Sequence, residues 1–327
     1  MTKMAMTQRE LGALEDFHDF DPAEDDFRTA ILDGLAKRQK ALSSKFFYDR
    51  RGSQLFDSIT ELPEYYPTRT EIGLLEHYAD DIKATVGPKP VVVEFGAGSV
   101  VKIRLLLDAV RAPVFVPIDI SREHLVASAR ELAADYSETR VIAICADFTR
   151  DIALPDDLPT TNRLGFFPGS TLGNFTRADA ERFLDRARTT LGPASAFLIG
   201  IDLRKDEPTL RAAYNDSQGV TAAFNLNLLR RINRELGATF DLKKFRHDAP
   251  WVEEEGRIEM RLVSTESQSV MVAGERFHFA EGEYIHTENS HKYDVDEFQA
   301  LARRAGYEPA RVWVDNDRRF SLHYLKA

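Results

Sequence analysis

Glycines and acidic residues at the ends of three apolar runs are the first residues of this sequence that could do chemistry. The run "VVVEF" leads into Gly96 and Gly98. The run "VFVPI" ends at Asp119, and the run "VIAICA" ends at Asp147. If these runs are parallel strands, their ends meet at one edge of a sheet, where open α/β sheets bind ligands. Glycine allows a ligand close to the backbone, and carboxylates accept hydrogen bonds from ribose hydroxyls or an amino group.

The turn "EFGAGSVVK" predicts a nucleoside ligand that carries no phosphate. A dinucleotide-binding turn needs a third glycine where Val101 stands, and the Gly-Lys-Ser/Thr of a P-loop is absent. S-adenosylmethionine fits better, with Asp119 at its ribose, Asp147 at its adenine and the ring of Phe148 against the base. Acidic residues at strand ends are also common helix caps. Three such strand ends together favour a methyltransferase over a nicotinamide oxidoreductase.

Apolar runs that alternate with amphipathic segments must position these residues. Strands are expected at 91–95, 114–120, 140–148, 163–170 and 195–203, with helices at 100–110, 121–136 and 178–192 between them. Ser121 is the expected N-cap of the second helix. A helix at 297–306, capped by Asp294 and Glu297, precedes an antiparallel hairpin of 310–314 and 320–327. The predicted fold class is α/β, with a mostly parallel, Rossmann-like sheet covered on both faces.

Two remaining segments are expected to form a second domain. Residues 1–25 are polar and acidic and read as a loosely held arm. The aromatic segment that follows predicts two helices separated by a turn at 63–67, the second at 69–82. Residues 204–293 interrupt the strand–helix progression, and so long an insertion needs its own core. We therefore predict a discontinuous α+β substrate-binding domain of 1–69 and 204–293, and a donor-binding domain of 70–203 and 294–327.

Composition narrows the classes of function. The 53 acidic and 43 basic residues give a formal charge of -10, which argues against nonspecific nucleic-acid binding. The single cysteine, Cys145, excludes an internal disulfide and lies in an apolar run, as a buried structural thiol would. Zinc-type Cys/His spacing, an N-terminal signal sequence and an apolar run of membrane-spanning length are absent from the sequence. We expect a soluble, cytoplasmic, monomeric protein.

Five phrases of the sequence resemble the histidine Nα-methyltransferases of ergothioneine biosynthesis. They are "KFFYDRRGSQLFDSITELPEYYPTRTE", "EFGAGSVVKIRLLLDA", "FFPGSTLGNF", "AYNDSQGVTAAFN" and "HTENSHKY". The similarity runs from about Phe27 to the C-terminus, and the first and third phrases are the specific ones. The resemblance implies a class I methyltransferase domain with a separate substrate-binding domain. It also implies trimethylation of the α-amine of L-histidine to hercynine, the first step of ergothioneine biosynthesis.

The resemblance also implies roles for matching residues. The methyl donor is placed against Gly96, Lys102, Asp119, Asp147 and Phe148. The substrate carboxylate is placed at Asn174 and Tyr214, and the α-amine near Tyr48, the catalytic candidate, and Tyr65. The pocket is lined by Phe56 and Thr221, and the imidazole meets Glu288 and Ser290 with Met260 close by.

The phrase "HTENSHKY" has a metal-binding alternative. If the segment is extended, residues two apart share a face, so His286, Glu288 and Ser290 are predicted to point the same way. Glu288 can then accept an imidazole N–H while Ser290 serves the other ring nitrogen. A metal needs more ligands than this face offers, so no metal is expected. A solvated strand with incidental charges is the remaining alternative.

Methyl transfer to an amine requires positioning and an unprotonated nucleophile. A tyrosine hydroxyl such as that of Tyr48 can hold the amine in line, and aromatic faces accommodate the methylated cation. On chemistry alone, Tyr48 could equally be a core residue, and Asn174 a residue that stabilises a turn. The alternative enzyme is a related N-methyltransferase for another amino acid or small amine. A non-catalytic binding protein on the same fold is the alternative outside enzymes.

Overall fold

The computed structural model describes residues 16–20, 24–98 and 100–327. This part of the chain divides into two compact units. The first unit contains the described part of Met1–Pro22 together with Pro67–Arg204 and Tyr293–Ala327, and the second contains Ala23–Tyr66 and Lys205–Lys292. Each unit is thus completed by segments that are far apart in the sequence.

The first unit is built on a sheet that has eight strands in the described residues. In spatial order they are β1 (Asp16–Asp19), β4 (Arg140–Cys145), β3 (Val114–Asp119), β2 (Val91–Phe95), β5 (Arg163–Phe167), β6 (Ala196–Asp202), β14 (Phe320–Lys326) and β13 (Glu308–Val314). All neighbours from β1 to β6 are parallel, and β14 pairs antiparallel with both β6 and β13. The predicted mostly parallel sheet with a C-terminal antiparallel hairpin is confirmed.

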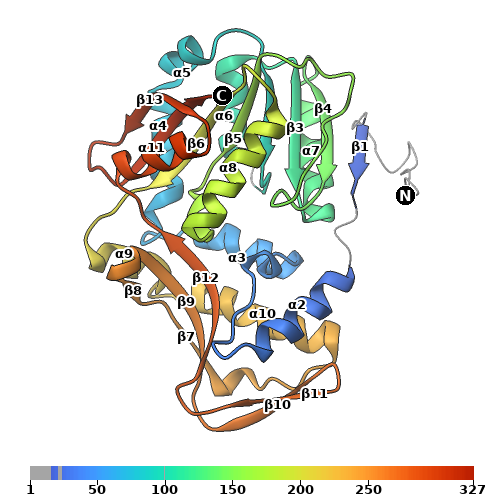
Figure 1. Cartoon of the computed structure of the whole chain (residues 1–327), viewed down its shortest axis with the longest axis vertical. Helices are drawn as coiled ribbons and strands as arrows, with labels where there is room; N and C mark the ends of the chain where they lie inside the picture. Colours follow the sequence, from blue (N-terminus) through green and yellow to red (C-terminus); the bar gives the residue numbers. More distant parts are fainter. Residues whose placement is uncertain (1–15, 21–23, 99) are drawn as a thin grey trace. The chain divides into compact units, whose positions relative to one another are not determined.

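The edge strand β1 differs from the prediction. Residues 16–19 pair in register with β4, from Asp16 opposite Ile142 to Asp19 opposite Cys145, and β1 stands beside β4 in Figure 1. The prediction of a loosely held arm is therefore wrong for these residues. The sequence "DFHD" has low strand propensity, so pairing with the otherwise open edge of β4, rather than local preference, forms this strand. The rest of the predicted arm before β1, residues 1–15, and residues 21–23 lie outside the described part of the chain.

Helices cover both faces of this sheet. On one face lie α4 (Tyr66–His77), α5 (Ala79–Val86), α6 (Val100–Val110) and α7 (Arg122–Asp135); on the other lie α8 (Arg177–Leu191) and α11 (Val295–Arg304). Successive side chains of β2 point to opposite faces of the sheet: Val92 packs with the first group of helices and Val93 with the second. The helix predicted at 69–82 instead begins earlier, with Pro67 in its first turn, and is interrupted at Tyr78. The capping box predicted at Asp294 forms.

The second unit packs helices against short antiparallel strands. Its helices are α2 (Glu24–Ala36), α3 (Arg50–Thr60), α9 (Glu207–Tyr214) and α10 (Val220–Leu236). Its strands are β7 (Phe245–Asp248), β8 (Trp251–Val252), β9 (Arg257–Ser264) and β12 (Tyr284–His291), with β10 (Gln268–Val272) and β11 (Glu275–Phe279) as a separate hairpin. Phe47, Phe224, Leu262 and Phe279 belong to one core drawn from both segments of this unit. The insertion therefore has the core that its length requires.

Candidate functional site

The glycine turn after β2 brings two predicted donor-binding residues together. Gly96 has a φ of +76°, and its N–H donates to the carbonyl of Ile118 over 2.8 Å. A Cβ atom at this position would lie 3.4 Å from the ring of Phe148. Glycine is needed mainly because a side chain would be strained at this positive φ. The turn thus places Gly96 against an aromatic ring, whereas a Cβ atom at Gly98 would meet no other atom within 4 Å.

The two acids after β3 and β4 both stabilise the turns that follow them. One oxygen of Asp119 accepts the N–H of Ser121 over 2.7 Å, and one oxygen of Asp147 accepts the N–H of Thr149 over 3.0 Å. Removal from water raises the pKa of Asp119, and the hydrogen bond from the N–H of Ser121 partly offsets this rise. Ser121 is the N-cap residue of α7, as predicted, but its side chain makes no capping bond, and Asp119 accepts its N–H. Both acids are therefore held at the predicted sheet edge.

Lys102 lies in a group of buried charges. Its ammonium nitrogen is 2.5 Å from a carboxylate oxygen of Glu71, a residue of α4 with no exposed surface. Glu71 also accepts the N–H of Gly169 over 2.8 Å. Burial raises the pKa of Glu94 in β2 well above its usual range, and the charge of Lys102 opposes this rise. The sequence pattern predicted no role for either glutamate, although Glu94 stands out as an acid inside an apolar strand.

The loop after β5 carries Asn174 at the end of a short 3₁₀ helix, η2 (Thr171–Asn174). Gly169 and Ser170, which precede it, both have left-handed backbone, with φ of +79° and +58°. For a serine this conformation is strained and must be imposed by its surroundings. The hydroxyl of Ser170 accepts the N–H of Asp202 over 2.9 Å, and Glu71 holds Gly169. These bonds fix the start of the segment that ends at Asn174.

In the second unit, five aromatic side chains form an aromatic cluster of Tyr48, Phe56, Tyr65, Tyr214 and Phe224. Ring centroids lie 5.8 Å apart for Tyr48 and Phe56, 6.4 Å for Phe56 and Tyr65, and 6.3 Å for Tyr65 and Tyr214, each in an edge-to-face arrangement. Phe224 of α10 joins them at 5.9 Å from Tyr48 and was not predicted from the sequence. The fold therefore gathers four of the residues predicted to bind substrate.

Tyr48 is fixed by the residue that follows it. Asp49 caps α3 by accepting the N–H of Gly52 over 2.8 Å, and it also accepts bonds from Asn227 and Arg234 of α10. Burial alone would raise the pKa of Asp49, but the bonds from Arg234, Gly52 and Asn227 lower it overall. The chain directly after Tyr48 is therefore tied to both α3 and α10.

Strands β9 and β12 place three further predicted residues on one face. Glu288 lies opposite Met260, and Ser290 lies opposite Ile258, so these side chains point the same way. A bulge between His286 and Glu288 breaks the alternation that we predicted. His286 consequently lies on the other face, where it is 2.9 Å from the side-chain oxygen of Asn289. The prediction that His286 shares the face of Glu288 is wrong because Thr287 is an extra residue in the strand.

Tyr214, Met260, Glu288, Ser290 and Lys292 form what we call the polar cluster. The hydroxyls of Tyr214 and Ser290 are 2.6 Å apart, and the ammonium of Lys292 donates to both, over 3.1 and 2.8 Å. Burial raises the pKa of Glu288 to about 8, with the charge of Lys292 opposing the shift. Lys292 was not predicted from the sequence, although it stands two residues after Ser290 and so on the same face.

Thr221 and Asn174 complete the set of predicted residues. Thr221 is buried in the first turn of α10, and its N–H donates to Asp216 over 2.8 Å. Asn174 belongs to the first unit and Tyr214 to the second, so their shared role for one carboxylate stays a prediction. The residues predicted to bind the methyl donor all lie in the first unit, and those predicted to bind the substrate, apart from Asn174, lie in the second.

Other kinds of site were also sought among the described residues. There, the His, Cys, Asp and Glu side chains form no group of three that could hold a metal ion. Burial raises the pKa of the Cys145 thiol to about 12, which makes it a poor nucleophile. Among the helices of the described ranges, none combines the length and the apolar character needed to cross a membrane.

Comparison with known proteins agrees with the resemblance. A sequence profile of the family described as "Histidine-specific methyltransferase, SAM-dependent" matches residues 27–327. The histidine N-alpha-methyltransferase of Mycolicibacterium smegmatis is 40% identical over 309 residues, which cover 92% of this chain and 95% of the relative. Ergothioneine biosynthesis protein 1 of Neurospora crassa is 31% identical over 88% of this chain and 33% of its own length. A 4-dimethylallyltryptophan N-methyltransferase of Aspergillus fumigatus is 26% identical over 90% of this chain and 92% of its own. This chain therefore belongs to the family of SAM-dependent, histidine-specific methyltransferases.

Proposed function

We propose that this protein transfers three methyl groups from S-adenosylmethionine to the α-amine of L-histidine, and that the product, hercynine, enters ergothioneine biosynthesis. The observation that carries this proposal is the shared face of β9 and β12, where Glu288, Ser290 and Met260 lie together. An acid, a hydroxyl and an apolar side chain complement the two nitrogens and the carbon edge of an imidazole. The relatives named for histidine and for ergothioneine biosynthesis support the same substrate.

The donor is assigned to the first unit. When bound, S-adenosylmethionine supplies a methyl carbon activated by its sulfonium sulfur. The residues present fit it: the glycine turn leaves open space at Gly98 for close backbone approach, with Phe148 packed against Gly96. Asp119 and Asp147 supply acceptors for hydroxyl and amino groups. Lys102 supplies a cation suited to the carboxylate of the donor.

The amino acid is assigned chiefly to the second unit. Glu288 accepts an imidazole N–H, Ser290 serves the other ring nitrogen, and Tyr214 donates to the carboxylate together with Asn174. Tyr65 is assigned to the amine, and Thr221 and Phe56 are assigned to the wall of the pocket. The ring of Tyr65 lies next to that of Phe56. The aromatic cluster offers ring faces to the cation that grows with each methyl group.

Tyr48 is assigned the amine itself. The amine attacks only when it has lost its proton, because its lone pair forms the new bond. The oxygen of Tyr48 accepts a hydrogen bond from an amine N–H, which fixes the direction of the lone pair. An unprotonated dimethylated amine has no N–H, so this bond serves the first two transfers and not the third. Each transfer releases one proton from the nitrogen.

A panel assay tests the proposed activity. The protein is incubated with isotopically labelled S-adenosylmethionine and each of the common amino acids, and products are read by mass. Trimethylated histidine is expected as the main product. Label on tryptophan or another amino acid instead would support the alternative, which the relative named for 4-dimethylallyltryptophan favours. Label on no amino acid would overturn both. We also propose that the enzyme is cytoplasmic, acts as a monomer and binds no nucleic acid. Light scattering of the purified protein tests whether it is a monomer.

A further inference from the structure

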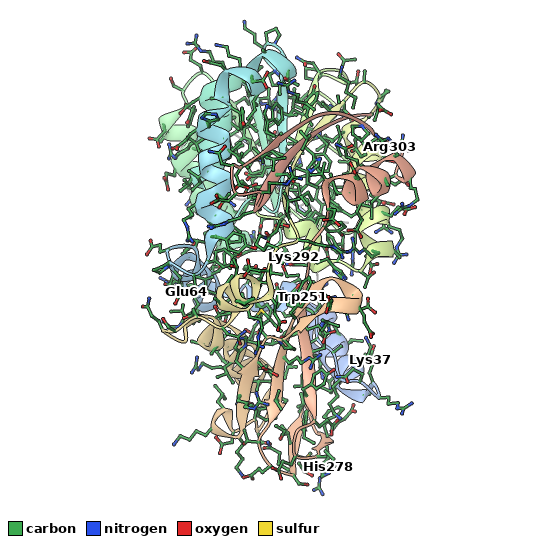
Figure 2. All side chains as sticks on the ribbon, turned by 90° about the vertical axis from the view of Figure 1, so that its left-hand side faces the viewer. Lys37, Glu64, Trp251, His278, Lys292 and Arg303 are labelled. Carbon is green, nitrogen blue, oxygen red and sulfur yellow. The ribbon has the colours of Figure 1, made fainter. Side chains whose placement is uncertain are left out.

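Lys292 is a buried lysine that the proposed chemistry does not yet use. Its side chain has no exposed surface, and its backbone N–H is anchored to the carbonyl of Gly256 over 2.8 Å. Figure 2 shows Lys292 among neighbouring side chains, whereas Lys37 and His278 lie at the outer surface of the protein. Removal of an ammonium group from water is costly, so a buried lysine needs a reason beyond packing.

The contacts of Lys292 restrict the protons of two hydroxyls. An ammonium only donates, so the oxygens of both Tyr214 and Ser290 accept from Lys292, over 3.1 and 2.8 Å. The two oxygens are also 2.6 Å apart, so one hydroxyl donates to the other. One proton is used within this pair, and the other hydroxyl must donate away from it. Because Tyr214 is assigned to donate to the carboxylate, Ser290 is the hydroxyl that donates within the pair, and its oxygen accepts the N–H of the second ring nitrogen. The proton directed outward then belongs to Tyr214.

The ammonium group of Lys292 also places a positive charge close to Tyr214 and Glu288. Lys292 lies 4.9 Å from the centre of the Tyr214 ring, and its charge is felt at Glu288, whose pKa it lowers against the effect of burial. A tyrosine hydroxyl that accepts from an ammonium is polarised and becomes a better donor to an anion. The same cation attracts the anion directly, with little screening because the site is buried.

We infer that Lys292 is a positioning residue for the carboxylate of the amino-acid substrate, acting through the hydroxyl of Tyr214. It directs the Tyr214 proton outward and adds the positive charge that makes the site prefer amines carrying a carboxylate. This inference deepens the proposed function and rests on it. It assigns Lys292 to substrate selection and not to the donor.

Binding of two histidine analogues tests the inference. Imidazolepropionate keeps the ring and the carboxylate of histidine, and histamine keeps the ring and the amine. Calorimetric titrations in the presence of S-adenosylhomocysteine compare the wild type with Lys292→Met. The affinity for imidazolepropionate should fall about 10- to 100-fold, the loss expected for a charge-assisted hydrogen bond, while histamine should change less than about threefold.

The matched control is Lys205→Met. Lys205 also donates to a tyrosine hydroxyl, that of Tyr66 over 2.6 Å, and lies 4.4 Å from the centre of that ring, but it is not part of the polar cluster. This variant should bind both analogues like the wild type. Lys292→Gln serves as a second variant should Lys292→Met fail to fold, which thermal unfolding reports, and the same preferential loss is expected.

Equal losses for the two analogues would overturn the inference, because they would mean that Lys292 only supports the local structure. Unchanged imidazolepropionate binding in both variants would also overturn it. Failure of the proposed function is distinguishable, since in that case the wild type would neither bind imidazolepropionate nor methylate histidine.

Discussion

Two lysines lie in the assigned binding sites, and the protein holds them in different ways. In the first unit, Lys102 forms a salt bridge with a wholly buried carboxylate, that of Glu71, which also binds the backbone of Gly169. In the second unit, Lys292 donates to the two hydroxyls of the polar cluster and lies near a tyrosine ring. Lys102 is held by a carboxylate that also fixes the backbone, whereas Lys292 orients hydroxyl groups that are assigned to a ligand.

This difference suggests two purposes: the network at Lys102 stabilises the first unit, and the polar cluster selects the substrate. The bonds of Glu71 connect helix α4, helix α6 and the loop after β5, so the network at Lys102 supports the fold of the first unit as well as the donor. The polar cluster joins α9, β9, β12 and the residue that follows β12 through side chains whose polar groups face one another. Changes at the first network should therefore lower the free energy of unfolding, and changes at the second should alter which substrate is accepted.

The largest effect on stability is expected for Glu71→Ala. The substitution leaves a buried ammonium without its carboxylate and the N–H of Gly169 without its acceptor, so the free energy of unfolding should fall by about 3–5 kcal/mol. Denaturant unfolding of the ligand-free protein measures this. Glu76→Ala, an exposed position on the same helix, should stay within about 0.5 kcal/mol of the wild type. Equal free energies of unfolding for the two variants would contradict a structural role for the Lys102 network.

Glu288 should make stability depend on pH. Its pKa in the folded protein is raised from 4.5 to about 8, chiefly by burial, so the folded state binds this proton more tightly than the unfolded chain. The contribution is fully present below about pH 4.5 and is lost as the pH rises toward 8. Between pH 5 and pH 8 the wild type should lose about 2–4 kcal/mol relative to Glu288→Gln, which stays neutral. Parallel pH profiles of the two proteins in denaturant unfolding would contradict the assignment.

Tyr48→Phe should slow methyl transfer without changing the fold. The turnover number with L-histidine should fall about 10- to 100-fold, because the amine loses the group that fixes its lone pair. With N,N-dimethylhistidine the fall should be less than about threefold, since this amine has no N–H to donate when unprotonated. Tyr78→Phe, in the first unit and outside the assigned sites, is the control. Equal losses on both substrates would mean that Tyr48 acts by packing alone.

Local patterns were sufficient to predict most of the first unit. Continuous apolar runs and their glycine or acidic ends identified β2 to β6 and the residues at their carboxyl ends, because strand period and turn chemistry are local properties. Glu71 could not be found in this way. It lies 98 residues from Gly169, and its partners are set by the packing of α4 on the sheet.

The second unit was predicted less completely, since its site is made of side chains from distant segments. The resemblance supplied Tyr48, Tyr214 and Glu288, but pattern alone placed His286 on the wrong face because the bulge at Thr287 changes the strand period. In the first unit, strand β1 likewise arises from pairing with β4 and has no periodicity of its own. Lys292 was within reach, as the next residue on the face of Glu288 and Ser290.

The central claim is that the polar cluster selects the amino acid while the first unit binds the donor, and one comparison tests it most directly. Glu288→Ala is assayed for kcat/KM with histidine and with a second accepted amino acid or analogue, and for its dissociation constant with S-adenosylhomocysteine. We predict a fall in the preference for histidine of about tenfold or more, the cost of a lost hydrogen bond to a charged or strongly polarised group, with donor affinity unchanged. An unchanged preference for histidine, or a loss of donor affinity as large as the loss of preference, would contradict this account.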